Sequence, residues 1–286
     1  MGLILCPQSE VSHPLYVADL GVHLHSMEEL CYVIYRYPLL VMDDFVDETL
    51  IEFLADDLKM ADYLRRLEKA GSRQLETDEL LCGILEYSDL YTRNELTAYR
   101  EHVRSLRGLQ DEEYALRKAD FMFEIVRYGQ AIRYYNKALR AYGDGTEPAF
   151  ASVAARAASG NEKRQKLLAR IYGCIGDAQA NLMLYREAYD SYSKANIISP
   201  DRTMLKKIYF LSLVDPVVEN RKVYTAYLGD NIEDEWDEEY DAALREVSSG
   251  TKGSELDGIF DKDSVKRKKA ISDMLDKWKQ EYRKML

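Results

Sequence analysis

Hydrophobic residues recur at intervals of three and four positions along most of the chain. Between residues 45 and 71, for example, Leu50, Leu54 and Leu64 follow this spacing, with charged residues between them. An apolar stripe with a period near 3.6 residues is typical of an amphipathic helix. The pattern therefore predicts an all-α fold, in which only residues 15–25 alternate weakly, as an extended segment does.

Capping signals indicate where some of these helices begin. Ser26 and Glu29 have the spacing of a capping box, and so do Thr92 and Glu95. Pro38 is expected to end the first of these helices, because proline lacks the backbone donor. Residues 26–108 are therefore predicted to form a bundle of about four or five helices.

Small and aromatic residues follow one another in a definite order within residues 172–201. The order runs Tyr172, Gly176, Ala188, Tyr192, Ala195 and Pro200. Two antiparallel helices approach closely only where side chains are small, while aromatic rings fill the remaining gaps. This stretch resembles the tetratricopeptide repeat, a helix-turn-helix unit of about 34 residues, although Tyr172 replaces the usual tryptophan and Gln179 an aromatic residue.

A second copy of the pattern lies earlier in the chain. Ala119, Ala131, Tyr135 and Ala138 have the separations of Gly176, Ala188, Tyr192 and Ala195, and each precedes its counterpart by the same interval. This interval is longer than the spacing of tandem copies, which is about 34 residues. Either the helix at 161–181 is long, or a short additional helix lies near 148–158. A degenerate third unit is expected over 203–228, with residues 233–247 as a cap, so the resemblance covers roughly residues 111–230.

Three regions follow from these patterns. Residues 1–108 are predicted to form an N-terminal helical domain, in which the segment up to His25 is partly extended. Residues 109–248 are predicted to form an α-solenoid of tetratricopeptide-like repeats. Residues 249–286 are predicted to form a linker, indicated by the stretch "SSGTKGSELDG" that begins at Ser248, and an amphipathic basic helix from about Ser264 to Leu286.

The resemblance also implies a binding surface. In such arrays, positions on the first helix of each repeat form a concave wall that binds peptides or helices of partner proteins. This register selects, as partner-binding residues, Arg117, Asp120, Glu124, Arg170, Cys174, Asp177, Asn181 and Lys207. They lack the full lysine and asparagine set that captures a terminal carboxylate in some members of the family. We therefore expect recognition of an internal segment or a helix.

Composition and charge narrow the choice of partners. The chain of 286 residues has 47% hydrophobic and 31% charged residues, which is typical of a folded protein. Its net charge of -11 disfavours nucleic acid, because phosphate binding needs a clustered basic surface. No apolar stretch reaches bilayer length, and the four cysteines have no C-x-x-C pair. A cytoplasmic protein that binds neither membranes nor nucleic acid is expected.

The sequence contains none of the standard catalytic or nucleotide-binding motifs, so neither an enzyme nor a cofactor is predicted. His23 and His25 would share one face of a strand, and a metal site with His13 or Cys6 is a minor hypothesis. The acid pairs Asp43/Asp44 and Asp56/Asp57 are interpreted as solvated surface, because adjacent carboxylates on a helix point in different directions.

Two charged segments leave alternatives open. Residues 230–241 contain eight acidic residues and are expected either to keep the end of the array soluble or to bind a basic partner, including the chain's own tail. In the tail, Ile271, Leu275, Trp278 and Tyr282 form one helical stripe. This stripe is predicted to pack on the same chain or, alternatively, to form a homodimer.

These observations favour a protein-interaction or scaffold module that binds a peptide or helical segment of a partner on the concave surface of its repeats. The alternative is a receptor for a signalling peptide or small molecule, with a pocket between the N-terminal domain and the repeats. An enzyme would require several polar groups to converge in one cavity.

Overall fold

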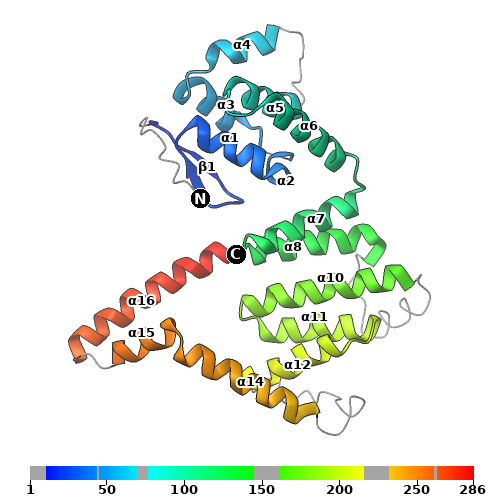
Figure 1. Ribbon diagram of the computed structural model, residues 1–286, viewed down its shortest axis with the longest axis vertical. Coiled ribbons are helices and arrows are strands. Elements are labelled where there is room, and N and C mark those ends of the chain that lie inside the picture. The colour runs from blue at the N-terminus through cyan, green and yellow to red at the C-terminus, as the bar shows by residue number, and fades with distance from the viewer. Residues whose placement is uncertain (1–10, 44, 70–76, 145–161, 216–231, 261–262) are drawn as a thin grey trace. The chain divides into compact units, whose positions relative to one another are not determined.

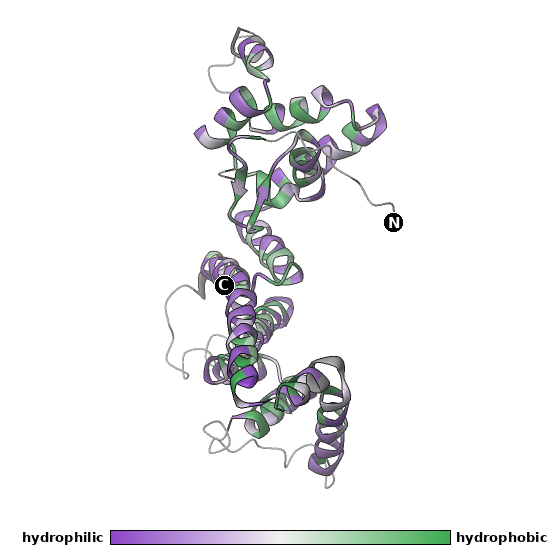
Figure 2. Cartoon of the chain, turned by 90° about the vertical axis from the view of Figure 1, so that its left-hand side faces the viewer, coloured by the Kyte–Doolittle hydropathy of each residue, from purple (hydrophilic) through white to green (hydrophobic). Residues whose placement is uncertain are grey.

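The computed structural model describes residues 11–43, 45–69, 77–144, 162–215, 232–260 and 263–286. Helices account for nearly all regular structure in these residues, which confirms the all-α prediction (Figure 1). Hydrophilic and hydrophobic residues alternate along the helices, as the sequence pattern requires (Figure 2). The chain forms two compact units, residues 1–110 and residues 111–286.

The first unit contains a short antiparallel β-hairpin followed by helices. Its elements, including a π-helical turn η1, are β1 (Leu15–Val17), β2 (Val22–Leu24), α1 (Met27–Arg36), α2 (Pro38–Val41), α3 (Glu48–Glu52), η1 (Phe53–Asp57), α4 (Ala61–Lys69), α5 (Thr77–Tyr87) and α6 (Arg93–Arg107).

The predicted helix starts in this unit are present, with one difference. At α6 both bonds of the capping box form, between Thr92 and Glu95. At α1 the Ser26 hydroxyl accepts from the backbone N–H of Glu29, but the Glu29 carboxylate accepts from the N–H of His25 instead of Ser26. The reciprocal bond is therefore shifted by one residue, to the residue that directly follows β2. Pro38 separates α1 from α2, as predicted.

The core of the first unit is built from the apolar stripes of these helices. Leu30 and Ile34 of α1, Leu50 of α3, and Ile84 and Leu85 of α5 are fully buried. Helix α5 contacts both α1 and α6. Helix α5 therefore holds α6 in place, and one face of α5 and one face of α6 remain toward solvent.

The second unit contains the remaining helices and a second π-helical turn, η2. Its elements are α7 (Asp111–Glu124), α8 (Tyr128–Leu139), η2 (Arg140–Asp144), α10 (Glu162–Asn181), α11 (Tyr185–Ile198), α12 (Arg202–Val214), α14 (Ile232–Ser249), α15 (Thr251–Phe260) and α16 (Ser264–Met285). The packing order α7, α8, α10, α11, α12 follows the chain (Figure 1).

Two helical hairpins in this unit, α7–α8 and α10–α11, share the same local geometry. Their turns place Val126 and Met183, which are separated by the same interval as Ala131 and Ala188, in the left-handed region, with φ of 64° and 60°. Equivalent backbone hydrogen bonds close both turns. Non-glycine residues rarely adopt this conformation, so its occurrence at the same position of both hairpins supports the repeat register deduced from the sequence.

Small residues form the contacts within each hairpin. Ala119, Ala131 and Ala188 are fully buried, and a Cβ atom on Gly176 would lie 2.5 Å from the ring of Tyr192. Helix α10 packs against both α8 and α11. At 20 residues it agrees with the first of the two explanations for the long repeat separation; the short helix considered near 148–158 lies outside the described residues.

The C-terminal part of the unit corrects one prediction. The stretch interpreted as a linker is helical: residues up to Ser249 belong to α14, and α15 continues from Thr251 after a bend at Gly250. Gly253 and Gly258 within α15 each carry a helix-propensity cost of about 1 kcal/mol relative to alanine, which is why the composition of this stretch indicates a linker. Contacts of α15 with α14 and α16 outweigh this local preference.

The beginning of this C-terminal segment contacts α12, and its end contacts the two hairpins. At its beginning, Trp236 of α14 is fully buried, and its ring lies 5.4 Å from that of Tyr209 in α12. At its end, the Tyr282 hydroxyl donates to the backbone carbonyl of Leu182 (3.3 Å), and the Arg127 guanidinium donates to that of Lys284. Helix α16 therefore ends against the turns of both hairpins.

Candidate functional site

Helix α10 provides the centre of the predicted binding surface. Arg170, Cys174 and Asp177 are spaced by four and three residues, so they lie on one face of the helix. The opposite face is apolar and includes the buried residues Ile171 and Ile175. Burial of that face against α8 and α11 fixes the direction of the polar face.

One carboxylate joins the first hairpin to α10. Asp120 of α7 accepts a hydrogen bond from the Tyr135 hydroxyl (2.7 Å) and pairs with the Arg170 guanidinium (2.7 Å). Burial and the neighbouring Asp120 carboxylate raise the pKa of Tyr135 far above its usual range, so its hydroxyl remains a donor at neutral pH. Three helices, α7, α8 and α10, meet at this carboxylate.

The second hairpin repeats the arrangement. Asp177 accepts from the Tyr192 hydroxyl (2.7 Å) and pairs with Lys207 of α12, whose Nζ lies 2.6 and 2.8 Å from the two carboxylate oxygens. The Lys207 ammonium also lies 5.5 Å from the centre of the Tyr192 ring, within the range of a cation–π contact. The same aspartate–tyrosine spacing is thus used twice, each time with a base from the next helix pair.

Cys174 lies between these two clusters. Burial raises the pKa of its thiol, and the carboxylates of Asp120 and Asp177 act in the same direction, while the Tyr135 hydrogen bond and Arg170 oppose them. The thiolate, not the thiol, is the nucleophile in cysteine chemistry. Cys174 is therefore a neutral polar lining residue at neutral pH.

An open cleft of about 290 Å³ runs along this face of α10 toward the beginning of α12. Arg170, Cys174 and Asp177 line it. The other lining residues are Lys166, Ala169, Gly173, Ser199, Asp201 and Met204. Positions 166–177 span about 16 Å of helix at 1.5 Å per residue. Two bases and two acids line the cleft, so their formal charges cancel.

Five of the eight predicted residues belong to this connected network, and three do not. Arg117 pairs with Glu113 of its own helix (3.0 Å), and Asn181 donates to the backbone carbonyl of Asp177 (2.8 Å). Glu124 is exposed near the end of α7. A register defines which positions share a helix face, but the length and partner of each side chain decide where its polar group lies.

Sequence reasoning missed the polar role of the two tyrosines. The sequence pattern predicts Tyr192 as a filler of the gap between helices and Tyr135 as its counterpart in the other copy, yet the hydroxyl groups of both bind the aspartates of the site. The signal was present, because Asp120 and Asp177 precede them by the same interval. Gln179, which replaces an aromatic residue in the repeat pattern, accepts a hydrogen bond from the Ser191 hydroxyl (2.6 Å).

The candidate residues of the first unit have partners within that unit. Asp57 accepts backbone hydrogen bonds from Ser12 and His13, and the ring of His23 lies 4.8 Å from that of Tyr16. No three histidine, cysteine or acidic residues converge as metal ligands in the part of the chain that is described; Cys6 and Asp44 lie outside it. Among the same residues, no helix is both long and apolar enough to span a bilayer.

Comparisons of the chain with protein-family models, with curated proteins and with solved structures gave no significant match.

Proposed function

We propose that helices α7–α12 form a tetratricopeptide-like array that binds an internal segment of a partner protein along α10. The observation that carries the proposal is the cleft of about 290 Å³, because three residues selected from the repeat register line it. The matching turns and the repeated aspartate–tyrosine pairs support the assignment of the array.

The chemistry of the cleft favours a peptide segment over a strongly charged ligand. Both carboxylates of the network already pair with bases, so a highly charged ligand would find no uncompensated countercharge. An extended or helical segment can instead use backbone and side-chain hydrogen bonds along the helix between positions 166 and 177. Met204 and Ala169 provide apolar contacts on the wall of the cleft.

A peptide library displayed on phage and selected on the full chain tests this proposal. The key variant is Ala169→Arg, which fills the cleft without removing an ion pair of the network. Its control is Glu187→Arg, which adds the same side chain on the exposed surface of α11. We expect Ala169→Arg to raise the Kd of selected peptides by at least about tenfold, equivalent to about 1.4 kcal/mol, and Glu187→Arg to leave it unchanged.

Circular dichroism and thermal unfolding of both variants establish that the fold is retained. If the selected peptides bind Ala169→Arg as tightly as the unmodified chain, the α10 cleft is not the binding surface. A selection that yields no saturable binder would also count against an interaction module.

We propose homodimerisation as a secondary role of α16. Its last turns contact the same chain, but Leu275 and Trp278 are 43% and 44% exposed, so the apolar stripe is only partly covered. Static light scattering over a concentration series tests this role with the variant Trp278→Ser. A monomer at all concentrations in the unmodified chain would contradict it.

A further inference from the structure

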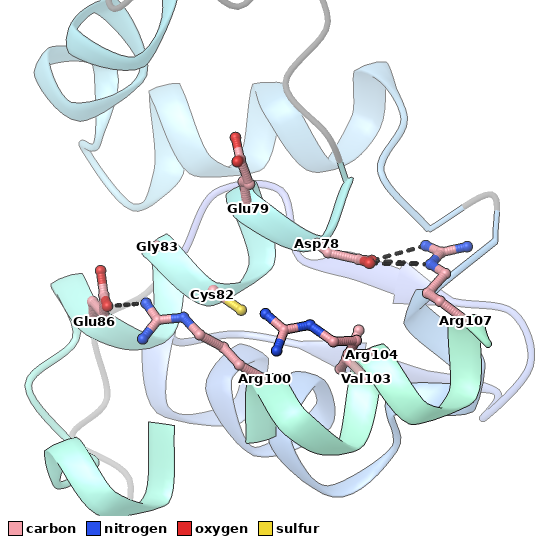
Figure 3. A pocket seen from close by; sticks show the side chains of 9 residues that line it. All are labelled: Asp78, Glu79, Cys82, Gly83, Glu86, Arg100, Val103, Arg104 and Arg107. Carbon is pink, nitrogen blue, oxygen red and sulfur yellow. Dashed lines mark hydrogen bonds and ion pairs between the residues drawn. The ribbon is translucent and has the colours of Figure 1, made fainter. Parts of the chain in front are cut away.

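A second cleft, of about 470 Å³, lies within the first unit between α5 and α6. Figure 3 shows acidic residues and a cysteine on α5 facing three arginines on α6. Asp78, Cys82 and Glu86 occupy successive turns of α5, and Arg100, Arg104 and Arg107 occupy successive turns of α6. The two rows run in opposite directions.

The outer positions of these rows are ion pairs. Arg107 binds Asp78 through two nitrogens, at 2.8 and 3.1 Å, and also donates to the backbone carbonyl of Met42 (2.7 Å). Arg100 pairs with Glu86 at the other end. Each guanidinium at the ends of the cleft therefore already has a carboxylate.

The middle position has a base but no acid. Cys82 and Arg104 hold the middle positions of the two rows, but the Cys82 thiol hydrogen-bonds to Arg100. No acidic group of the described residues forms an ion pair with Arg104. Burial raises the pKa of the Cys82 thiol, so it is neutral where a carboxylate would complete the row. Glu79 also lines the cleft, but its side chain points away from the three guanidinium groups (Figure 3).

We propose that this cleft binds a monocarboxylate, with Arg104 as the residue that anchors it. A carboxylate accepts two parallel hydrogen bonds from a guanidinium, and it would also relieve the repulsion between Arg104 and the arginines one turn away. The volume lies within the range of small-molecule sites. Val103 and Gly83 offer uncharged surface to the rest of the ligand.

The same geometry disfavours a doubly charged anion. Asp78 and Glu86 lie on either side of the middle position, so a phosphate dianion there would meet two carboxylates. One positive charge, that of Arg104, lacks an ionic partner among the described residues. The cleft thus matches a single negative charge attached to a neutral body, such as a small organic acid or the terminal carboxylate of a peptide.

Isothermal titration calorimetry of the full chain tests this proposal with four probes. Butyrate represents a free organic acid, N-acetylleucine represents a peptide terminus, N-acetylleucinamide lacks the charge, and inorganic phosphate at pH 8 is the dianion. We expect saturable binding of one or both carboxylates with a Kd of about 1 mM or below, and no binding of the amide. The carboxylate with the lower Kd shows whether the cleft prefers a free organic acid or the terminal carboxylate of a peptide.

Variants of the middle position show where the carboxylate binds. Arg104→Gln should raise the Kd at least about tenfold, while Arg93→Gln, at the start of the same helix and outside the cleft, should leave it unchanged. Cys82→Asp places an internal carboxylate at the middle position of the α5 row, inside the cleft, and should abolish binding. Cys82→Asn, of the same shape but neutral, should retain it.

Equal affinity of the carboxylates for Arg104→Gln and the unmodified chain would overturn the proposal. Tighter binding of phosphate than of either carboxylate would also overturn it, and so would the absence of carboxylate binding up to about 20 mM, well above the millimolar Kd expected of one anchored charge. Arg104→Lys serves as a further variant if the glutamine variant fails to fold, and partial retention of binding is then expected.

Discussion

The hydroxyl group of Tyr192 lies 2.7 Å from a carboxylate oxygen of Asp177. The same relationship joins Tyr135 and Asp120 in the preceding hairpin. In both cases a tyrosine of the second helix fixes an aspartate of the first helix, and a base from a later helix completes the charge balance. Packing of small residues and this polar contact therefore specify the same helix pairing.

Removal of one of these hydroxyl groups should destabilise the second unit. Tyr192→Phe leaves Asp177 paired with Lys207 but removes a buried hydrogen bond to a charged acceptor, so we expect a loss of about 1–2 kcal/mol in the free energy of unfolding. Urea denaturation measures this loss. Tyr16→Phe, whose side chain is 55% exposed, is the control and should change the free energy by less than about 0.5 kcal/mol.

The two ion pairs of the site should differ in strength. The side chains of Asp177 and Lys207 are 30% and 33% exposed, whereas Arg170 is 55% exposed. Double-mutant cycles with alanine should give a coupling energy of about 0.5–1 kcal/mol for Asp177–Lys207 and a smaller value for Asp120–Arg170. Both couplings should decrease in about 1 M NaCl, and a larger value for the more exposed pair would contradict this ranking.

Gly176 should not tolerate even a methyl group. Gly176→Ala places a Cβ atom 2.5 Å from the Tyr192 ring, so the two helices must separate or the ring must move. We expect a destabilisation of about 1–3 kcal/mol by thermal or urea denaturation. Gly258→Ala provides a matched control in α15, where a Cβ meets no atom within 4 Å, and it should be neutral or stabilising through helix propensity.

Substitutions at the α7–α8 turn should release the end of α16. A Cβ atom on Gly129 would collide with the backbone of Leu286, and Arg127→Ala removes the donor to the Lys284 carbonyl. Both Gly129→Ala and Arg127→Ala should accelerate trypsin cleavage within residues 264–286. Arg133→Ala, on the exposed surface of α8, should leave the rate unchanged; unchanged rates in the two turn variants would show that these contacts do not retain the helix.

Stability should fall in the alkaline range. Burial raises the pKa of Cys31 from 9.0 to about 11, so the folded state binds this proton more tightly than the unfolded state. The resulting stability is complete below about pH 9 and is lost between about pH 9 and 11, with a maximum of about 3 kcal/mol at roughly 1.36 kcal/mol per pKa unit. Urea denaturation at pH 8 and pH 10 measures the decrease in the free energy of unfolding between the two pH values. This decrease should be smaller for Cys31→Ala than for the unmodified chain.

Most helix positions followed from the sequence because their signals are local. Thr92 and Glu95 form their capping box within a single helical turn, and Pro38 stops a helix by its own chemistry. The helix over residues 251–260 was missed because its glycines and serine oppose helix formation locally. Contacts with α14 and α16 reverse that preference, and such contacts cannot be deduced from composition.

The sequence predicted which residues of the candidate site share a helix face, but not which side chains pair with one another. The spacing of Arg170, Cys174 and Asp177 placed them on one face, where the cleft lies. That Arg170 would pair with Asp120 of the preceding hairpin depends on how α7 and α10 pack. The cleft between α5 and α6 could not be predicted for the same reason, since the acidic residues of α5 and the arginines of α6 come together only when the two helices face each other.

Helix α10 contacts both α8 of the first hairpin and α11 of the second. A helix shared in this way couples the unfolding of its neighbours, because α10 cannot separate from α8 or from α11 without exposing apolar surface on both helices. The two hairpins should therefore melt together in a single cooperative transition, with one denaturant slope for both. A break in the middle of α10 would divide that transition into two.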